Sequence, residues 1–335
     1  MKKVLFFIFL FILMIGNVSA LKITSLGDSI PNGVLLDDSE KSYDNKIAKL
    51  LNAELYEYSV SGITTDDLLK ALDKKEVKEN IKNSDIVFIN IGSGDLLDLT
   101  DDIDFSKFGF NPKEKMDLIS ETATKFKNYL IDAFVNKLEP KTEKVIKNFE
   151  SKFKTIIKKI KEYNSKAKIY VNNAYNPFLN LSIPFVLDLS EVEKAVEEAI
   201  KSFNNMLKTN EDYTVIDIYS ILKNNDYLNI DVLNNSFDPH PNELGHEKIY
   251  EAYLKELCYK ITYDGKDYYI LKGDKFEIEP KQKEGYTFEK WNYDLNNIDK
   301  DIELKEIYKK NINYLYFIIP GVLVLVIIFI IIKKH

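Results

Sequence analysis

The chain has 335 residues and a net charge of −7, and 45% of its residues are hydrophobic. The hydrophobic content is enough for a sizeable core, and the length exceeds that of one ordinary small domain. All 46 basic residues are lysine, and no basic cluster is larger than a helix face, which argues against a nucleic-acid partner. The single cysteine, Cys258, excludes an intrachain disulfide.

Both ends of the chain are apolar segments next to lysines. Two lysines, an uncharged run and the small residues "VSA" predict that residues 1–20 are a secretory signal peptide. Residues 314–332 carry no charge and are long enough to cross a bilayer core of ~30 Å. Lysines follow them, so we expect a single-pass protein of the cell membrane with residues 21–313 outside.

Between these ends, strand-like runs alternate with segments of helical period. The runs are residues 22–25, 55–60, 85–91, 168–172 and 213–218. Helices are predicted over residues 43–51 and 146–163, from Ser190 to Leu207 with Glu193 completing a capping box, and from Pro241 to Leu257. This alternation predicts βα units and a parallel sheet.

Two further segments depart from this alternation. Residues 99–142 are charged and contain no clear strand, so we interpret them as an insertion over the sheet that could serve as a lid. After Cys258 come short alternating strands with a turn at Asp264-Gly265, which predict a small β module. Its core is expected to contain Trp291, with Tyr286 and Phe288.

Turns rich in small residues follow three of the predicted strands. Ser29 lies after the first strand, Gly62 after the second, and residues 92–95 ("GSGD") after the third. In a doubly wound sheet, ligands bind beyond the carboxyl ends of the strands. Small residues allow backbone N–H groups to approach a ligand closely.

A histidine is expected at the same edge of the sheet. His240, in "SFDPHPNELGH", follows the fifth strand and precedes the last helix, so it can meet Ser29 as a general base meets a nucleophile. The chain lacks G-x-S-x-G, H-E-x-x-H, a cysteine cluster and a glycine-rich phosphate loop. We therefore expect neither a metal nor a cofactor.

These blocks resemble the GDSL or SGNH serine hydrolases, a family of esterases, lipases and acyl hydrolases. Gly27-Asp28-Ser29-Ile30 with Gly33 is similar to the first block, and Gly62 to the second. Residues 92–95 and "HPNELGH" are similar to the third and the last, so the likeness covers residues 21–257. It implies a flavodoxin-like, three-layer α/β/α SGNH fold with a parallel sheet, and a serine esterase that works through an acyl-enzyme.

The resemblance also implies a role for individual residues. Ser29 would be the nucleophile and His240 its base. The family's acid stands in D-x-x-H, whereas this chain has D-x-H, so Asp238 would orient His240, with Asp231 as the alternative. His246, which follows in the same motif, is interpreted as a structural residue of the last helix.

The oxyanion hole implied by the resemblance departs from the family's pattern. It would use the backbone N–H groups of Ser29 and Gly62, but Gly94 stands where the family has an asparagine. One donor is then missing unless Ser93 or Asn90 replaces it, and Gly94→Asn would be expected to raise turnover. Asp95 is interpreted as a helix cap.

The β module resembles the Listeria-Bacteroides (internalin B-type) repeat through "LKGDKFEI" and "KEGYTFEKW", which implies a stalk or a ligand-binding unit. The expected domains are a signal peptide (1–20), a hydrolase domain (21–257), the β module (258–310) and a membrane anchor (311–335). The substrate would be an ester, either an O-acetyl group of a surface glycan or a lipid acyl ester. The alternative is a non-catalytic surface adhesin or binding protein on a degenerate hydrolase scaffold.

Overall fold

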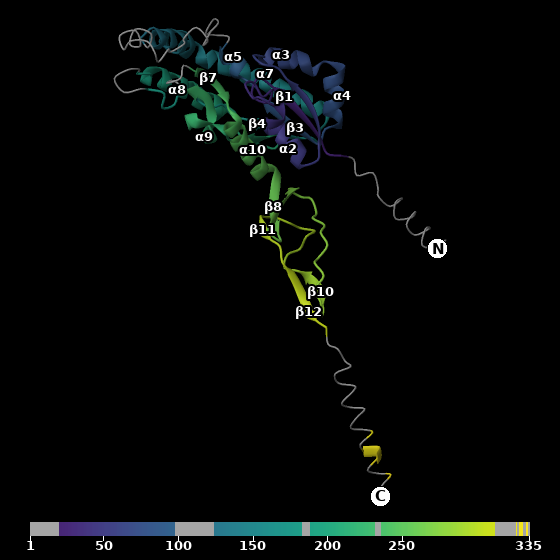
Figure 1. Ribbon diagram of the computed structural model, residues 1–335. Helices are drawn as coiled ribbons and strands as arrows, with labels where there is room; N and C mark the ends of the chain where they lie inside the picture. The colour runs from purple at the N-terminus through teal and green to yellow at the C-terminus, as the bar shows by residue number, and fades with distance from the viewer. Residues whose placement is uncertain are drawn as a thin grey trace. The chain divides into compact units, whose positions relative to one another are not determined.

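The computed structural model describes residues 20–97, 124–182, 188–231 and 236–311, with residues 326, 328–330 and 333 near the C-terminus (Figure 1). The chain divides into two compact units, Met1–Glu256 and Leu257–His335. Within the described ranges, no helix is both long and apolar enough to cross a bilayer. Nearly all of the predicted signal peptide and of the predicted span 314–332 lies outside those ranges.

A five-stranded parallel sheet forms the centre of the first unit, in the order β2-β1-β3-β4-β5. All five predicted strands are present. Their bounds are Lys22–Gly27 (β1), Glu54–Ser59 (β2), Ile86–Asn90 (β3), Lys168–Asn172 (β4) and Thr214–Ile216 (β5). Strand order switches at β1, and sheets of this kind bind ligands beyond the carboxyl ends of the strands at that point.

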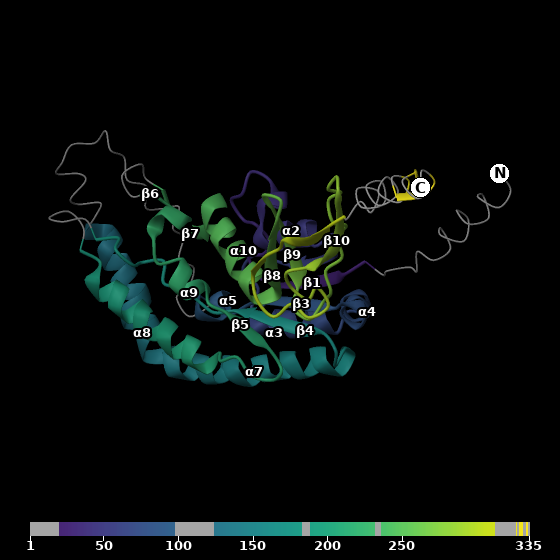
Figure 2. The same cartoon turned by 90° about the horizontal axis from the view of Figure 1, so that it is seen from below.

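Helices cover both faces of this sheet, which confirms the three-layer α/β/α prediction (Figure 2). Along β3 the side chains alternate between the two faces. Val87 and Ile89 belong to the core formed with α3, α4 and α7, whereas Phe88 packs against Tyr253 with ring centroids 4.7 Å apart. The helices on the first face are α3 (Thr65–Leu72), α4 (Lys75–Asn83) and α7 (Thr142–Tyr163), and those on the second are α2 (Tyr43–Leu50) and α10 (Glu243–Leu257).

The helix α8 (Ser190–Met206) begins where it was predicted, but its capping box does not form. Leu189 occupies the N-cap position, and the carboxylate of Asp188 accepts the Ser190 N–H at 3.0 Å instead. Glu193 accepts a hydrogen bond from the backbone N–H of Asn180 at 3.3 Å. The prediction of a capping box was therefore wrong, because Ser190 lies inside the helix and Asp188 accepts its backbone N–H.

Part of the predicted insertion 99–142 belongs to the core of the first unit. Residues 98–123 lie outside the described ranges, while 124–130 are helical and continue into a π-helix, η4 (Ile131–Leu138), and a 3₁₀ turn, η5 (Glu139–Lys141). Leu130 and Phe134 are buried in a cluster with Val196 of α8. Whether the insertion serves as a lid stays a prediction.

Shorter elements complete the first unit. They are η1 (Ser39–Lys41), α5 (Ser93–Leu97), α9 (Ile218–Ile221), η6 (Asn225–Tyr227) and the antiparallel pair β6 (Leu228–Asp231) and β7 (Ser236–Pro241). This pair was not predicted, and it carries His240.

The second unit consists of short strands. They are β8 (Cys258–Tyr263), β9 (Lys266–Leu271), β10 (Tyr286–Trp291), β11 (Ile302–Glu303) and β12 (Glu306–Lys310), in sheets β11-β8-β9 and β10-β12. Asp264 and Gly265 both have positive φ, as a two-residue hairpin turn requires. Trp291 packs edge-on against buried Tyr263, but Tyr286 is 37% exposed, so its predicted place in the core was wrong. The likeness of this unit to the internalin-type repeat stays a prediction.

Candidate active site

Ser29, His240 and Asp238 are brought together at the carboxyl end of the sheet. Ser29 lies two residues after the end of β1, and His240 lies in β7. The Nε2 atom of His240 is 2.7 Å from the Oγ atom of Ser29. On the other side of the ring, Nδ1 is hydrogen-bonded to Oδ1 of Asp238. The hydroxyl thus contacts the imidazole, and the imidazole contacts the carboxylate. A nucleophile, its general base and an orienting acid make the same two contacts.

The strand conformation of β7 explains how a D-x-H spacing can hold the imidazole. Residues two apart in a strand point to the same side, so Asp238 and His240 face each other. Partial burial raises the pKa of the Asp238 carboxyl, but hydrogen bonds from the ring and backbone of His240 outweigh it and keep the pKa below its ordinary value. Asp231 pairs with Ser236 in the hairpin, and its side chain lies outside the described part of the structure.

Two side chains that the sequence did not single out hold the backbone around His240. The amide of Asn229 donates to the carbonyl of His240 at 3.1 Å and to that of Pro241 at 3.3 Å. The hydroxyl of Tyr175 donates to the carbonyl of Pro239 at 2.5 Å. The first contact lies within the hairpin of β6 and β7, whereas the second joins segments 64 positions apart in the chain.

Asp28, the residue before the serine, is the centre of a buried polar network. Its carboxylate accepts from the amide of Asn90 at 2.6 Å, from the backbone of Ile30 at 3.2 Å and from the hydroxyl of Ser93. Burial raises the pKa of this carboxyl, although these hydrogen bonds oppose the rise. Asn172 donates to Asn90 at 2.8 Å and so extends the network to β4. One signal was available in the sequence, because the buried strands β3 and β4 both end in asparagine.

The two candidates for a replacement oxyanion donor therefore direct hydrogen bonds at Asp28. The single hydroxyl proton of Ser93 is used there, and one amide proton of Asn90 is as well. Gly94 itself leaves no room for a side chain. A Cβ atom at this position would lie 2.4 Å from the carbonyl oxygen of Ile63 and 3.2 Å from that of Gly62. The expectation that asparagine here would add a well-aimed donor is contradicted, since backbone atoms occupy the space.

Residues 25–248 match the model of the GDSL-like Lipase/Acylhydrolase family. The chain belongs to this family. It is also 26% identical, over 246 residues, to the uncharacterized protein YpmR of Bacillus subtilis (strain 168), a match that spans 70% of this chain and 82% of that one. Family membership supports ester hydrolysis as the activity.

Solved structures resemble the first unit. Phospholipase A1 from Streptomyces albidoflavus NA297 is 18% identical with a TM-score of 0.49, covering 71% of this chain and 99% of that one. The lipase Lip_vut3 from a goat rumen metagenome is 21% identical with a TM-score of 0.45, covering 70% and 96%. The acetylxylan esterase Axe2 from Geobacillus stearothermophilus is 17% identical with a TM-score of 0.38, covering 71% and 94%. At these TM-scores the likenesses do not indicate a substrate.

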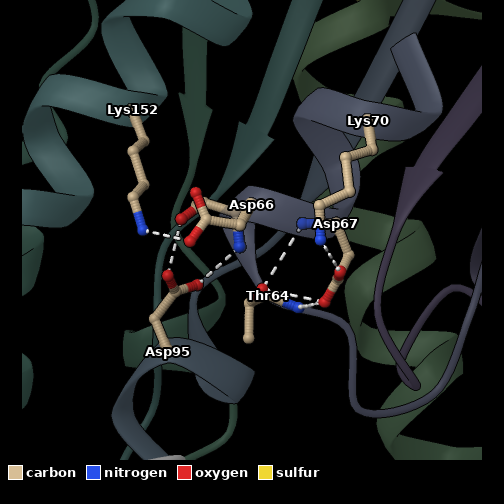
Figure 3. Close-up of polar contacts among 7 residues, drawn as sticks. Thr64, Asp66, Asp67, Lys70, Asp95 and Lys152 are labelled. Atoms are coloured by element: carbon tan, nitrogen blue, oxygen red, sulfur yellow. Dashed lines mark hydrogen bonds and ion pairs between the residues drawn. The ribbon is translucent and has the colours of Figure 1, made fainter. Parts of the chain in front are cut away.

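Asp95 of α5 is hydrogen-bonded to the start of α3, which follows the loop that holds Gly62 (Figure 3). From α5, its carboxylate accepts the backbone N–H of Thr65 at 2.9 Å and the Thr65 hydroxyl at 2.5 Å. Asp95 lies inside α5 and bonds the first residue of α3, whose N-cap is Thr64, so the interpretation of Asp95 as a helix cap was wrong. Lys152 of α7 bonds Asp66 at 2.7 Å beside it. Together with the close approach at Gly94, this contact fixes the Gly62 loop against α5.

His246 is a buried structural residue of α10. It is 0% exposed, stacks on Tyr43 with ring centroids 6.1 Å apart, and accepts the Tyr43 backbone N–H at Nδ1 over 3.3 Å. Burial, with smaller contributions from the charges of Lys46 and His240, lowers the pKa of His246 to about 4. The neutral ring is therefore the folded form at neutral pH, and it makes no contact with Ser29 among those described.

A cavity of about 170 Å³ adjoins Ser29 and His240. The carboxyl ends of β1, β3 and β4 form one side of it, with Asp28, Asn90 and Asn172 among the lining residues. The remaining side chains are mostly apolar and come from α5, η4, α8 and the segment after β4. The Ser29 hydroxyl thus borders a partly open, mostly apolar space.

Proposed function

We propose that this protein hydrolyses carboxylic esters through a covalent acyl-enzyme on Ser29. The observation that carries the proposal is the 2.7 Å contact between Ser29 Oγ and His240 Nε2, with Asp238 on the other ring nitrogen. Ser29 Oγ attacks the carbonyl carbon of the ester while His240 takes its proton. The tetrahedral intermediate collapses, and the departing alkoxide takes that proton. Water then attacks the acyl-enzyme with His240 again as base, which releases the acid and restores Ser29.

Asp238 serves this cycle by fixing the ring. Its carboxylate accepts the Nδ1 proton, which leaves Nε2 as the unprotonated atom facing Ser29. It also stabilises the imidazolium that forms when His240 is protonated. Because hydrogen bonds from His240 keep the Asp238 pKa below its ordinary value, the carboxylate is charged at neutral pH.

Oxyanion stabilisation in this proposal rests on the backbone N–H groups of Ser29 and Gly62. Glycine at position 94 supplies no side-chain donor, and Ser93 is turned to Asp28. Removing one oxyanion donor typically lowers kcat by ~10²–10³. We therefore expect real but slow turnover.

The test is labelling of the full-length chain by a fluorophosphonate, together with hydrolysis of p-nitrophenyl butyrate. Ser29→Ala should abolish both and leave the melting temperature nearly unchanged, and His240→Ala should be about as damaging because the triad acts as a unit. Ser151→Ala, at an exposed serine of α7, is the matched control and should behave as the parent. Turnover that survives Ser29→Ala would place the nucleophile elsewhere. A parent that neither labels nor turns over would favour a non-catalytic surface role.

We also propose that the hydrolase unit is displayed on the outer face of the cell membrane. This part rests on the sequence alone, through the signal-peptide pattern of residues 1–20 and the uncharged segment 314–332. Protease added to intact cells should digest the hydrolase unit. A unit that is degraded only after the cells are lysed would contradict the proposed location.

A further inference from the structure

We infer that the cavity beside Ser29 is an acyl-chain site, so that the enzyme selects esters of medium-chain fatty acids over acetyl esters. The inference rests on the proposed function, because it places the acyl group of the Ser29 acyl-enzyme in this space. It decides between the two substrate classes that the sequence left open.

The cavity wall is apolar on the sides away from the catalytic residues. The side chains that form it are Leu96, Phe134, Phe178, Val196, Ala199 and Ile200. The rings of Phe134 and Phe178 meet edge-on, with centroids 4.8 Å apart. An alkyl chain loses contact with water against such a wall, whereas the hydroxyl groups of a sugar would lose their hydrogen bonds.

The polar lining residues are engaged with one another and do not form a sugar-binding surface. Asp28, Asn90 and Asn172 are joined by side-chain hydrogen bonds of 2.6 and 2.8 Å. Asn173 donates to Asp217 at 2.9 Å and accepts the backbone N–H of Tyr219 at 2.8 Å. A ligand that needs polar partners in this space would have to break these contacts, while an alkyl chain leaves them in place.

Hydrogen bonds between the segment after β4 and α8 hold two walls of the cavity in place. Asn204 of α8 exchanges two hydrogen bonds of 2.8 Å with the backbone of Ala174. The amide of Asn176 donates to the carbonyl of Glu193 at 3.2 Å, and its oxygen accepts the N–H of Phe178 at 2.9 Å. These bonds fix the segment after β4 against α8, so the two walls hold their separation. A preformed apolar pocket with a few polar groups at its mouth is the usual form of a small-molecule site.

Its size sets the length of the acyl chain. The volume of about 170 Å³ is close to the ~150 Å³ of a dry apolar cavity that accommodates benzene, a six-carbon ligand. An acetyl group would leave most of this space unfilled. A chain of about eight carbons would place its carboxyl carbon at Ser29 and much of its alkyl part in the cavity.

The experiment compares p-nitrophenyl acetate with p-nitrophenyl octanoate on the full-length chain. Each buried methylene raises kcat/KM about fourfold (~0.8 kcal/mol), so burial of only three of the six additional methylenes gives a preference for octanoate of about 60-fold. We expect a ratio of that size or larger. A parent that hydrolyses acetate as well as octanoate would overturn the inference and leave the ester hydrolase in place. Failure to hydrolyse either ester or to label with fluorophosphonate would instead remove the proposed function.

Ala199→Leu tests where the preference arises. Ala199 lines the cavity, and a leucine there should lower the octanoate-to-acetate ratio by about tenfold or more. The control is Ala195→Leu, the same substitution one turn earlier in α8 at a buried alanine that does not line the cavity, and its ratio should equal the parent's. Ala199→Val is the milder substitution if leucine lowers the melting temperature. An unchanged ratio in the folded Ala199 variants, or an equal change in Ala195→Leu, would contradict the acyl site.

Discussion

Acidification from pH 6.5 to about pH 4 should destabilise the first unit through His246. Burial lowers the pKa of this histidine to about 4 in the folded unit, against an ordinary value of 6.5. Between these values the unfolded chain binds a proton that the folded unit excludes, so stability is present above pH 6.5 and is lost as the pH falls. The two pKa values differ by about 2.5, and at ~1.36 kcal/mol per pKa unit the full loss is about 3 kcal/mol.

The measurement is urea unfolding of the parent and of His246→Asn across this pH range, followed by far-UV CD. The described long helices lie in the first unit, whereas Trp291 lies in the second and would report on that one. Asparagine keeps an acceptor for the Tyr43 N–H and does not titrate. Asp28 and Asp44, whose pKa values are raised by burial, change stability in the opposite sense, so the quantity of interest is the difference between the two proteins. Parallel pH profiles would refute the reasoning.

Three further substitutions probe the site. Asp238→Asn should lower kcat by up to ~10⁴ through the wrong tautomer of His240; a smaller loss than in Asp231→Asn would move the acid to Asp231. Gly94→Ala should cost about 1–3 kcal/mol of stability, because its Cβ would lie 2.4 Å from a backbone oxygen; an unchanged melting temperature would contradict this. Tyr175→Phe removes a hydrogen bond of ~1 kcal/mol to the backbone of β7, the strand that carries His240. It should lower kcat at temperatures where the unit is still folded. A lower melting temperature with an unchanged kcat would mean that Tyr175 does not position His240.

The parts of the fold that the sequence predicted are those with strong local signals. The strands β3 and β4 contain the apolar runs "IVFI" and "IYV", and α7 has apolar residues at a long helical period. These patterns predict which residues are buried. Ser29 was found because a turn of small residues follows the first strand, and His240 because it stands between the fifth predicted strand and the last predicted helix. The hairpin of β6 and β7 was missed, since "LNID" and "SFDPHP" contain the Asn, Asp and Pro residues that strands disfavour.

Contacts between distant segments explain what else the sequence could not predict. Gly94 looked like a lost asparagine, but it is a close approach between α5 and the carbonyl of Ile63, thirty-one positions earlier in the chain. The network around Asp28 joins the ends of three strands, and part of the apolar wall of the cavity forms where η4 meets α8. No periodicity or motif predicts these contacts, because each forms only when distant segments pack together in the folded unit.

Ser29 and His240 are 211 positions apart in the chain. A nascent chain therefore cannot form their contact until nearly the whole hydrolase unit has been synthesised. During synthesis the serine leaves the ribosome early, with β1, whereas the histidine follows only after every strand of the sheet. A partly synthesised or truncated chain therefore holds the hydroxyl without its partner, whatever else has folded. If Ser29 is the nucleophile as proposed, fluorophosphonate labelling of a refolding sample would report when Ser29 and His240 have come into contact.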